Sequence, residues 1–436
     1  MKSVRLWRCL AFGVWLAASA AGNPLAAEFE RGEWRIKLNG QNRTLGTFTR
    51  AQDAERFLVD ALDAPPPRAL PTRPGSGLLL NRTRLTAEAA SGDRFSAQLS
   101  YDNELRTGSG LDSLGFVLGD RIGNATGFDL DRTYTRRDDL DTRHQIYRAW
   151  GRYEGERLTL TVGRQRIALG RARLWNPTEL FNPIFPLQIE GTQRIGQDAV
   201  VARWKATENF WTEVIWAPQR DADQSRVAGR VEWIAQAFEA SLMAGRFERD
   251  YLVGADFARN MGDAVVRAEA SFMDLAAGGR SWQAVGAIDY TFPLGSGLYT
   301  LVEHLYNENR GFDFNNQVLS GFPVLPPATL EERLNLLEGL IETPGFQVAL
   351  DRFPTQRALH LTGFQFSYEV SSLLNGALLV LADWDGPSSA IFPTLTYQVW
   401  EDVELTLGTQ LFVGPENRSE FGDAANVVFL QLDLYF

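Results

Sequence analysis

Apolar and polar residues alternate along most of the chain with a period of two, in segments of about ten residues. The last segment, residues 426–436, shows the pattern most clearly. Its even-numbered positions from Val428 to Phe436 are apolar, whereas Gln431 and Asp433 on the other side are polar. Successive side chains of a strand point to opposite faces. The alternation therefore predicts strands whose two faces meet different surroundings.

The same pattern marks sixteen further segments, which gives seventeen with the last one. They begin near Leu78, Phe95, Gln145, Leu158, Ala199, Glu208, Arg226, Ala237, Tyr251, Ala264, Trp282, Leu298, Phe364, Leu374, Ile391 and Val403. Tight turns, such as Ser91-Gly92-Asp93 and Gly295-Ser296-Gly297, alternate with long outer loops at residues 43–77, 107–142, 169–197 and 309–354. Turns and loops are therefore expected at opposite rims of one sheet.

The fold class that this pattern predicts is an all-β transmembrane antiparallel β-barrel, and its terminal Phe436 resembles the C-terminal signal of bacterial outer-membrane barrels. If the last strand ends at the periplasmic rim, counting strands backward makes the strand near Leu78 run toward the periplasm. A strand that runs the opposite way must therefore precede it, and Glu33–Asn42 has the required alternation. Because bacterial single-chain barrels have even strand numbers, we predict 18 strands, with 16 as the alternative. A soluble periplasmic sandwich would also alternate, but a chain of this length would usually divide into domains.

Aromatic residues support the membrane hypothesis, because they gather near strand ends as in interfacial girdles. These residues are Trp204, Trp216, Trp233, Tyr290, Phe292, Trp384, Tyr397 and Trp400. After residue 27 no apolar stretch approaches the length of a membrane helix.

The first 27 residues predict a secretory signal peptide: Lys2, Arg5 and Arg8 precede an apolar run at residues 10–21, and small residues follow. We expect cleavage after Ala27, with Ala20 as the alternative. Residues 28–436 would then form one barrel domain in the bacterial outer membrane. Within it, Thr49–Ala64 and Leu330–Glu342 predict short helices in outer loops or in the lumen, and the acidic stretch 107–142 predicts a solvated loop.

Composition excludes several functions. The 43 basic and 54 acidic residues give a net charge of −11, which disfavours nucleic acid as a partner. Cys9 is the one cysteine, and His144, His304 and His360 are the three histidines. We therefore expect no metal site and no cofactor. No recognisable nucleophile motif accompanies the histidines, so we expect no enzyme activity, and the acidic loop lacks the ligand spacing of a calcium loop.

Charged residues occupy the faces opposite the apolar ones and are our candidate pore lining. They are Arg82, Arg84, Arg148, Arg152, Arg203, Lys205, Arg226, Arg230 and Arg267 with Glu213, Glu232 and Glu269. The alternative is that they form ion-pair ladders between neighbouring strands. Residues 28–270 hold 34 basic and 34 acidic residues, whereas residues 271–436 hold 6 and 20. An arginine-rich wall facing an acidic wall is therefore expected across the lumen.

One motif carries a family resemblance. The segment Gly163-Arg164-Gln165-Arg166-Ile167-Ala168-Leu169-Gly170-Arg171-Ala172-Arg173, followed by a strand that begins Gln197-Asp198-Ala199, resembles the alginate-export family of outer-membrane channels. The resemblance implies an eighteen-stranded export pore whose arginines, here Arg164, Arg166, Arg171, Arg173 and Arg203, pass an anionic polysaccharide. Arg164 and Arg166 share a face with Leu158 and would point outward to lipopolysaccharide unless a β-bulge intervenes. The stretch 175–186 departs from the family, and it either folds inward as a constriction or caps the rim.

Two functions follow from these patterns. The first is a channel for an anionic polysaccharide or other anionic solute, because the planar donor fork of arginine matches a carboxylate. Its partners would be outer-membrane lipid, lipopolysaccharide and periplasmic export machinery. The alternative is a general or substrate-specific diffusion porin for small solutes, and a structural role with a plugged lumen comes third.

Overall fold

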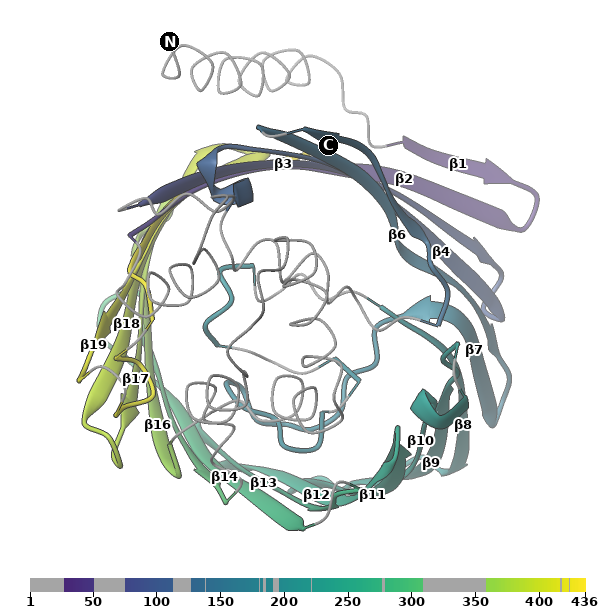
Figure 1. Ribbon diagram of the computed structural model, residues 1–436. Helices are drawn as coiled ribbons and strands as arrows, with labels where there is room; N and C mark the ends of the chain where they lie inside the picture. The colour runs from purple at the N-terminus through teal and green to yellow at the C-terminus, as the bar shows by residue number, and fades with distance from the viewer. Residues whose placement is uncertain are drawn as a thin grey trace, which may run out of the picture.

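The computed structural model describes residues 27–50, 75–112, 127–137, 139–179, 181–182, 186–190, 196–220, 222–276, 279–308, 358–415, 418–422 and 424–436. Within these ranges the chain forms one closed antiparallel barrel, seen along its axis in Figure 1. Residues 1–26 of the expected signal peptide 1–27, the predicted helix Leu330–Glu342 and most of Thr49–Ala64 lie outside the described residues. Thr49 itself is the last residue of a strand.

Eighteen strands of the described chain make the barrel wall, which confirms the predicted number and class. They are β2 (Trp34–Thr49), β3 (Ser76–Ser91), β4 (Phe95–Thr107), β6 (Leu140–Glu154), β7 (Leu158–Gln165), β8 (Gln197–Thr207), β9 (Phe210–Ala217), β10 (Arg226–Ile234), β11 (Glu239–Phe247), β12 (Asp250–Met261), β13 (Ala264–Asp274), β14 (Arg280–Phe292), β15 (Leu298–Asn307), β16 (His360–Ser371), β17 (Leu374–Asp383), β18 (Ser388–Trp400), β19 (Val403–Val413) and β20 (Val427–Tyr435). Each pairs with the next, and β20 pairs with β2 from Gln41↔Tyr435 to Thr49↔Val427. This last pairing closes the ring, so no wall strand is left with a free edge along its length.

Two short strands lie beside the wall. β1 (Ala27–Arg31) pairs with residues 34–38 at the start of β2, which β20 does not reach. β5 (Asp131–Arg137) pairs with the end of β6 that β7 does not reach. The acidic stretch 107–142 was expected to be a solvated loop, and this prediction is wrong for residues 131–137, which form β5.

Connections sort to two rims as predicted. The turns at Ser91-Gly92-Asp93 and Gly295-Ser296-Gly297 join β3 to β4 and β14 to β15, and the long connections all leave the other rim. The predicted start of the loop 43–77 is wrong, because residues 43–49 belong to β2, which continues to Thr49.

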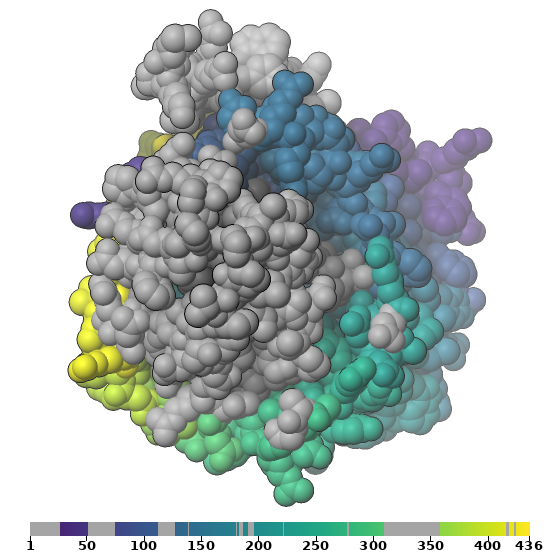
Figure 2. Space-filling model, viewed as in Figure 1, coloured from purple at the N-terminus to yellow at the C-terminus, as the bar shows by residue number. Residues whose placement is uncertain are grey.

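The outer face of the barrel is apolar and exposed. In β10, Val227, Val231 and Trp233 are exposed whereas Arg226 and Arg230 are buried on the inner side. The predicted girdle residues Trp204, Trp216, Trp233, Phe292, Trp384, Tyr397 and Trp400 are all at least 43% exposed. In the space-filling view of Figure 2, the strands from purple to yellow form the outer ring of the molecule. None of the helices among the described residues is long and apolar enough to cross a membrane.

Candidate functional site

The chain that follows β7 turns into the barrel and lies inside the lumen (Figure 1). We call the described residues 166–179, 181–182 and 186–190 the lumen segment. Its first part and Phe181 pack on the inner face of β9 to β13, where Ile167, Leu169 and Phe181 join a buried cluster with Ile215 and Phe247. The sequence left inward folding and rim capping equally open, and the inward arrangement is the one observed.

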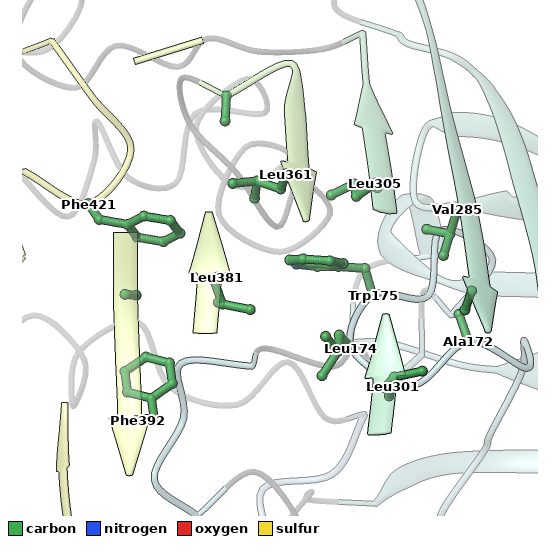
Figure 3. Packing of buried hydrophobic residues seen from close by; sticks show 13 residues of the cluster. Ala172, Leu174, Trp175, Val285, Leu301, Leu305, Leu361, Leu381, Phe392 and Phe421 are labelled. Carbon is green, nitrogen blue, oxygen red and sulfur yellow. The ribbon is translucent and has the colours of Figure 1, made fainter. Parts of the chain in front are cut away.

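The middle of the lumen segment packs on the next part of the wall. Leu174 and Trp175 lie among inward side chains of β14 to β18, including Leu301, Leu305 and Leu381 (Figure 3). Trp175 is only 1% exposed. A buried tryptophan of this size makes a large contribution to holding the segment against the wall.

The last part reaches the strands on either side of the barrel closure. Ile189 packs against Leu45 and Leu80. The carboxylate of Glu190 accepts hydrogen bonds from Arg82 at 2.7 Å and Arg43 at 3.3 Å. The lumen segment therefore contacts the inner wall on β9 to β19 and again on β20, β2 and β3.

Two carboxylates from the wall fix the backbone of the lumen segment. Glu269 on β13 accepts hydrogen bonds from the N–H groups of Arg171 at 2.9 Å and Thr178 at 2.8 Å, and from the Thr178 hydroxyl at 2.7 Å. Glu303 on β15 accepts from the N–H groups of Arg173, Leu174 and Trp175 at 2.8–2.9 Å. Glu269 is 3% exposed. Its predicted pore-lining role is wrong, because the lumen segment covers it.

Arg171 adds an ionic anchor. Its guanidinium contacts Glu232 at 2.5 Å and Asp256 at 2.6 Å, and it also pairs with Glu239. Burial alone would lower the pKa of Arg171, but the surrounding carboxylates raise it above its usual value. Arg171 and Glu232 therefore hold the segment to β10, β11 and β12 instead of facing a solute.

Arg164 is a second buried arginine of the motif. It is 2% exposed, and its guanidinium binds Asp198 at 2.8 and 2.9 Å and the carbonyl oxygens of Ile146 and Phe128. The predicted contact of Arg164 with lipopolysaccharide is wrong for this reason. Gly163 before it has φ +119°, and a Cβ there would lie 2.2 Å from the Ala149 carbonyl oxygen. A glycine is therefore required at this position of β7.

Arg166 and Arg173 differ from these two arginines, because both side chains are exposed. Neither guanidinium has an ion pair or hydrogen bond with the part of the chain that the structure describes. Arg173 lies within electrostatic range of Tyr299 on the inner face of β15. The lumen segment thus carries two cations that are not neutralised by the described wall.

Arg166 lies beside a basic cluster on the wall. Ser100 pairs with Arg148 and Tyr101 with Ile146, so Tyr147 is the extra residue of a β-bulge. The Arg84 guanidinium lies 3.4 Å and that of Arg148 4.1 Å from the Tyr147 ring centroid. Arg84 and Arg166 are both within electrostatic range of Arg148.

The remaining predicted pore residues fall into two groups. Most form the ion-pair ladders that were the alternative: Arg82 with Glu104, Arg84 with Asp102, Arg203 with Glu213, Arg226 with Glu248, Arg230 with Glu232, and Arg267 with Asp289. Arg152 and Lys205 are exposed.

Two further residues of the motif serve the backbone and the wall. Gln165 donates hydrogen bonds to the backbone of Thr161 and Ala199, and Gly170 lies against Glu269.

Several carboxylates of the predicted acidic wall are engaged in ion pairs or hydrogen bonds among the described residues. Asp289 pairs with Arg267, and Asp433 pairs with Arg43 at 2.6 Å. Asp383 accepts hydrogen bonds from the N–H groups of Asp385 and Gly386 at 3.0 Å. These carboxylates hold the barrel and its connections together.

No family model and no curated protein matches the sequence. Solved structures do match. OccAB1 of Acinetobacter baumannii is 11% identical, with 95% of this chain and 99% of that chain covered and a TM-score of 0.50. OccAB3 of Acinetobacter baumannii is 10% identical, with 92% of this chain and 99% of that chain covered and a TM-score of 0.51. The outer membrane protein OpdK of Pseudomonas aeruginosa is 8% identical, with 92% of this chain and 98% of that chain covered and a TM-score of 0.50.

The chain has the fold of an outer-membrane β-barrel. The shared fold and the apolar outer face agree on this point, as the sequence predicted. The comparisons give no support to the alginate-export resemblance.

Sequence reasoning missed three residues of the site, namely Glu303, Glu179 and Tyr147. Glu303 had a visible signal, because it lies between the apolar inward residues Leu301 and Leu305. Glu179 accepts N–H bonds from Leu169, Phe181 and Asn182 within the segment itself. No local pattern marks Tyr147, since its bulge depends on the pairing of β6 with β4.

Proposed function

We propose that this protein is a passive diffusion channel for small anionic solutes. The observation that carries the proposal is a lumen segment fixed to the wall and bearing the exposed guanidiniums of Arg166 and Arg173. The wall fixes the segment in the lumen, and the two exposed guanidiniums contact the passing solute.

Fixation of the segment supports passive diffusion. Apolar side chains at the start and in the middle are buried against the wall, Ile189 near the end is partly buried there, and Glu269, Glu303 and Arg171 fix the backbone between them. Releasing these contacts would expose apolar surface and leave buried charges unpaired, which costs several kcal/mol. A constriction of this kind stays in place while solutes pass.

Local charge supports an anion as the solute. Arg148 has Arg84, Arg166 and Asp102 as electrostatic neighbours; Asp102 pairs with Arg84, whereas Arg166 has no carboxylate partner in the described chain. Like charges close together attract an anion to the space between them. Each guanidinium also offers the planar donor pair that a carboxylate accepts.

An anionic polysaccharide is the second candidate, because the same guanidiniums would contact uronate groups. A segment attached to so much of the inner wall takes up room in the lumen, which favours small solutes over a polymer. Both candidates share the barrel, and solute size separates them.

Transport by the purified protein in liposomes and planar bilayers tests the proposal. We expect gluconate to enter several-fold faster than glucose, which has a similar size and no charge, and the reversal potential to indicate anion preference. Oligouronates should block the current weakly or not at all. Exchanging Arg166 and Arg173 for glutamine should remove most of the preference for gluconate.

A control variant, Arg280→Gln, removes an exposed cation at the start of β14 and should leave selectivity unchanged. Equal rates for gluconate and glucose, or cation preference, would overturn the proposal. Saturable passage of long oligouronates would support the polysaccharide candidate instead.

A further inference from the structure

Two of the three histidines of the chain meet on the outer face of the barrel. His304 lies on β15 between Glu303 and Leu305, whose side chains point inward, so His304 points outward and is exposed. His360 begins the neighbouring strand β16, at the rim of the long connections. The exposed Trp384 lies beside them and donates its backbone N–H to the His360 carbonyl oxygen.

The two imidazoles approach each other through nitrogen atoms. Nε2 of His304 lies 3.2 Å from Nδ1 of His360, and the rings are stacked with an interplanar angle of 25°. Two nitrogen ligands at about 2.0–2.1 Å from a tetrahedral metal ion are roughly 3.3 Å apart. The 3.2 Å contact is a hydrogen bond between the two rings, and it is also close to the spacing of two ligands on one ion.

The partner of the other His304 nitrogen suits this role. Nδ1 of His304 lies 2.9 Å from Oγ1 of Thr362, and the same oxygen accepts the indole N–H of Trp384 at 2.8 Å. Metal-bound histidines usually donate their second ring N–H to an oxygen that fixes the ring. When Nδ1–H donates to Thr362, the Nε2 lone pair of His304 accepts a hydrogen bond from Nδ1–H of His360. A metal ion would take the place of that shared proton, and His360 would then carry its ring proton on Nε2.

Nearby carboxylates are already engaged. Oδ2 of Asp385 accepts the backbone N–H groups of Leu359 and His360, both at 2.8 Å. The described residues contain no cluster of three or more histidine, cysteine or carboxylate ligands. The pair therefore suits an ion that prefers imidazole nitrogen and completes its shell with water, which favours transition metals over Ca²⁺ or Mg²⁺.

We propose that His304 and His360 bind a divalent transition-metal ion such as Cu²⁺ or Zn²⁺ on the outer face of the barrel. The ion links β15 to β16 at the outer rim, with Thr362 as a positioning residue. This site lies on the opposite face of the wall from the lumen segment and is independent of solute passage.

Copper binding to the full chain in detergent tests the site. Electron paramagnetic resonance with one equivalent of Cu²⁺ should show coupling to two imidazole nitrogens. His304→Gln and His360→Gln should each leave at most one coupled nitrogen and weaken binding at least about 10-fold. His144→Gln changes the only other histidine and is the matched control, with both nitrogens retained.

Two further measurements separate this site from a structural role of the pair. Thr362→Val keeps the shape of the side chain, and it should weaken Cu²⁺ binding about 10-fold while the two-nitrogen signal persists. Zn²⁺ should raise the unfolding temperature of the parent chain and of His144→Gln, but not of either other histidine variant. An unchanged Cu²⁺ spectrum in His304→Gln and His360→Gln, or no binding by the parent chain, would overturn the proposal. Circular dichroism of each variant verifies that the barrel has formed.

Discussion

At the scale of single residues, the motif contains the unit Gly-Arg-X-Arg twice, at residues 163–166 and 170–173. In each unit the glycine has a positive φ, the first arginine is held by carboxylates and the second arginine is exposed. Sequence reasoning picked out all four arginines as a set. It could not separate anchors from exposed cations, because the carboxylates that bind Arg171 come from β10, β11 and β12.

Gly170 gives a prediction at this scale. It has φ +76°, and a Cβ there would lie 2.5 Å from a carboxylate oxygen of Glu269. Gly170→Ala should therefore lower the free energy of unfolding by about 1–3 kcal/mol, because both the strained backbone and the close contact disfavour it. Urea unfolding followed by tryptophan fluorescence measures this effect. Gly229→Ala on β10 is the control, since nothing lies within 4 Å of its added Cβ. Equal stabilities of the two variants would contradict the argument.

At the scale of elements, strands were predictable because the two faces of each strand meet lipid and lumen, which imposes a period of two on the sequence. All eighteen wall strands were found in this way. β5 was missed because its residues Asp131–Arg137 are mostly polar and almost all exposed, so they do not alternate between an apolar and a polar face. The inward course of the lumen segment was left open for a related reason: its contacts are with strands far away in the sequence.

Trp175 tests how the lumen segment is held. Trp175→Ala should lower the free energy of unfolding by about 3–5 kcal/mol, because the indole is almost fully buried between the segment and β14 to β18. The loosened segment should also give a larger and noisier single-channel current. Trp400→Ala removes a 70% exposed tryptophan from the outer face and is the control. An unchanged current in Trp175→Ala would mean that the segment does not narrow the conducting path.

At the scale of the whole molecule, charge counts along the sequence predicted a field across the lumen between an arginine-rich and an acidic wall. In the described chain most of those charges neutralise one another in ladders or bind backbone groups, so composition alone overstated the field. What remains is local: Arg166 and Arg173 project from the lumen segment, and Arg148 has basic neighbours. The number of charges was readable from the sequence, but their pairing required the register of the barrel.

Salt distinguishes a local site from a long-range field. The Debye length falls from about 10 Å at 0.1 M to about 3 Å at 1 M salt, so attraction of anions over longer distances is screened while direct contact with a guanidinium persists. Anion preference in KCl, measured from the reversal potential, should therefore fall between 0.1 M and 1 M but stay above unity. The variant with glutamine at positions 166 and 173 should be close to unselective at both concentrations. Preference that vanishes entirely at 1 M in the parent protein would mean that the whole charge distribution, and not these two arginines, selects the solute.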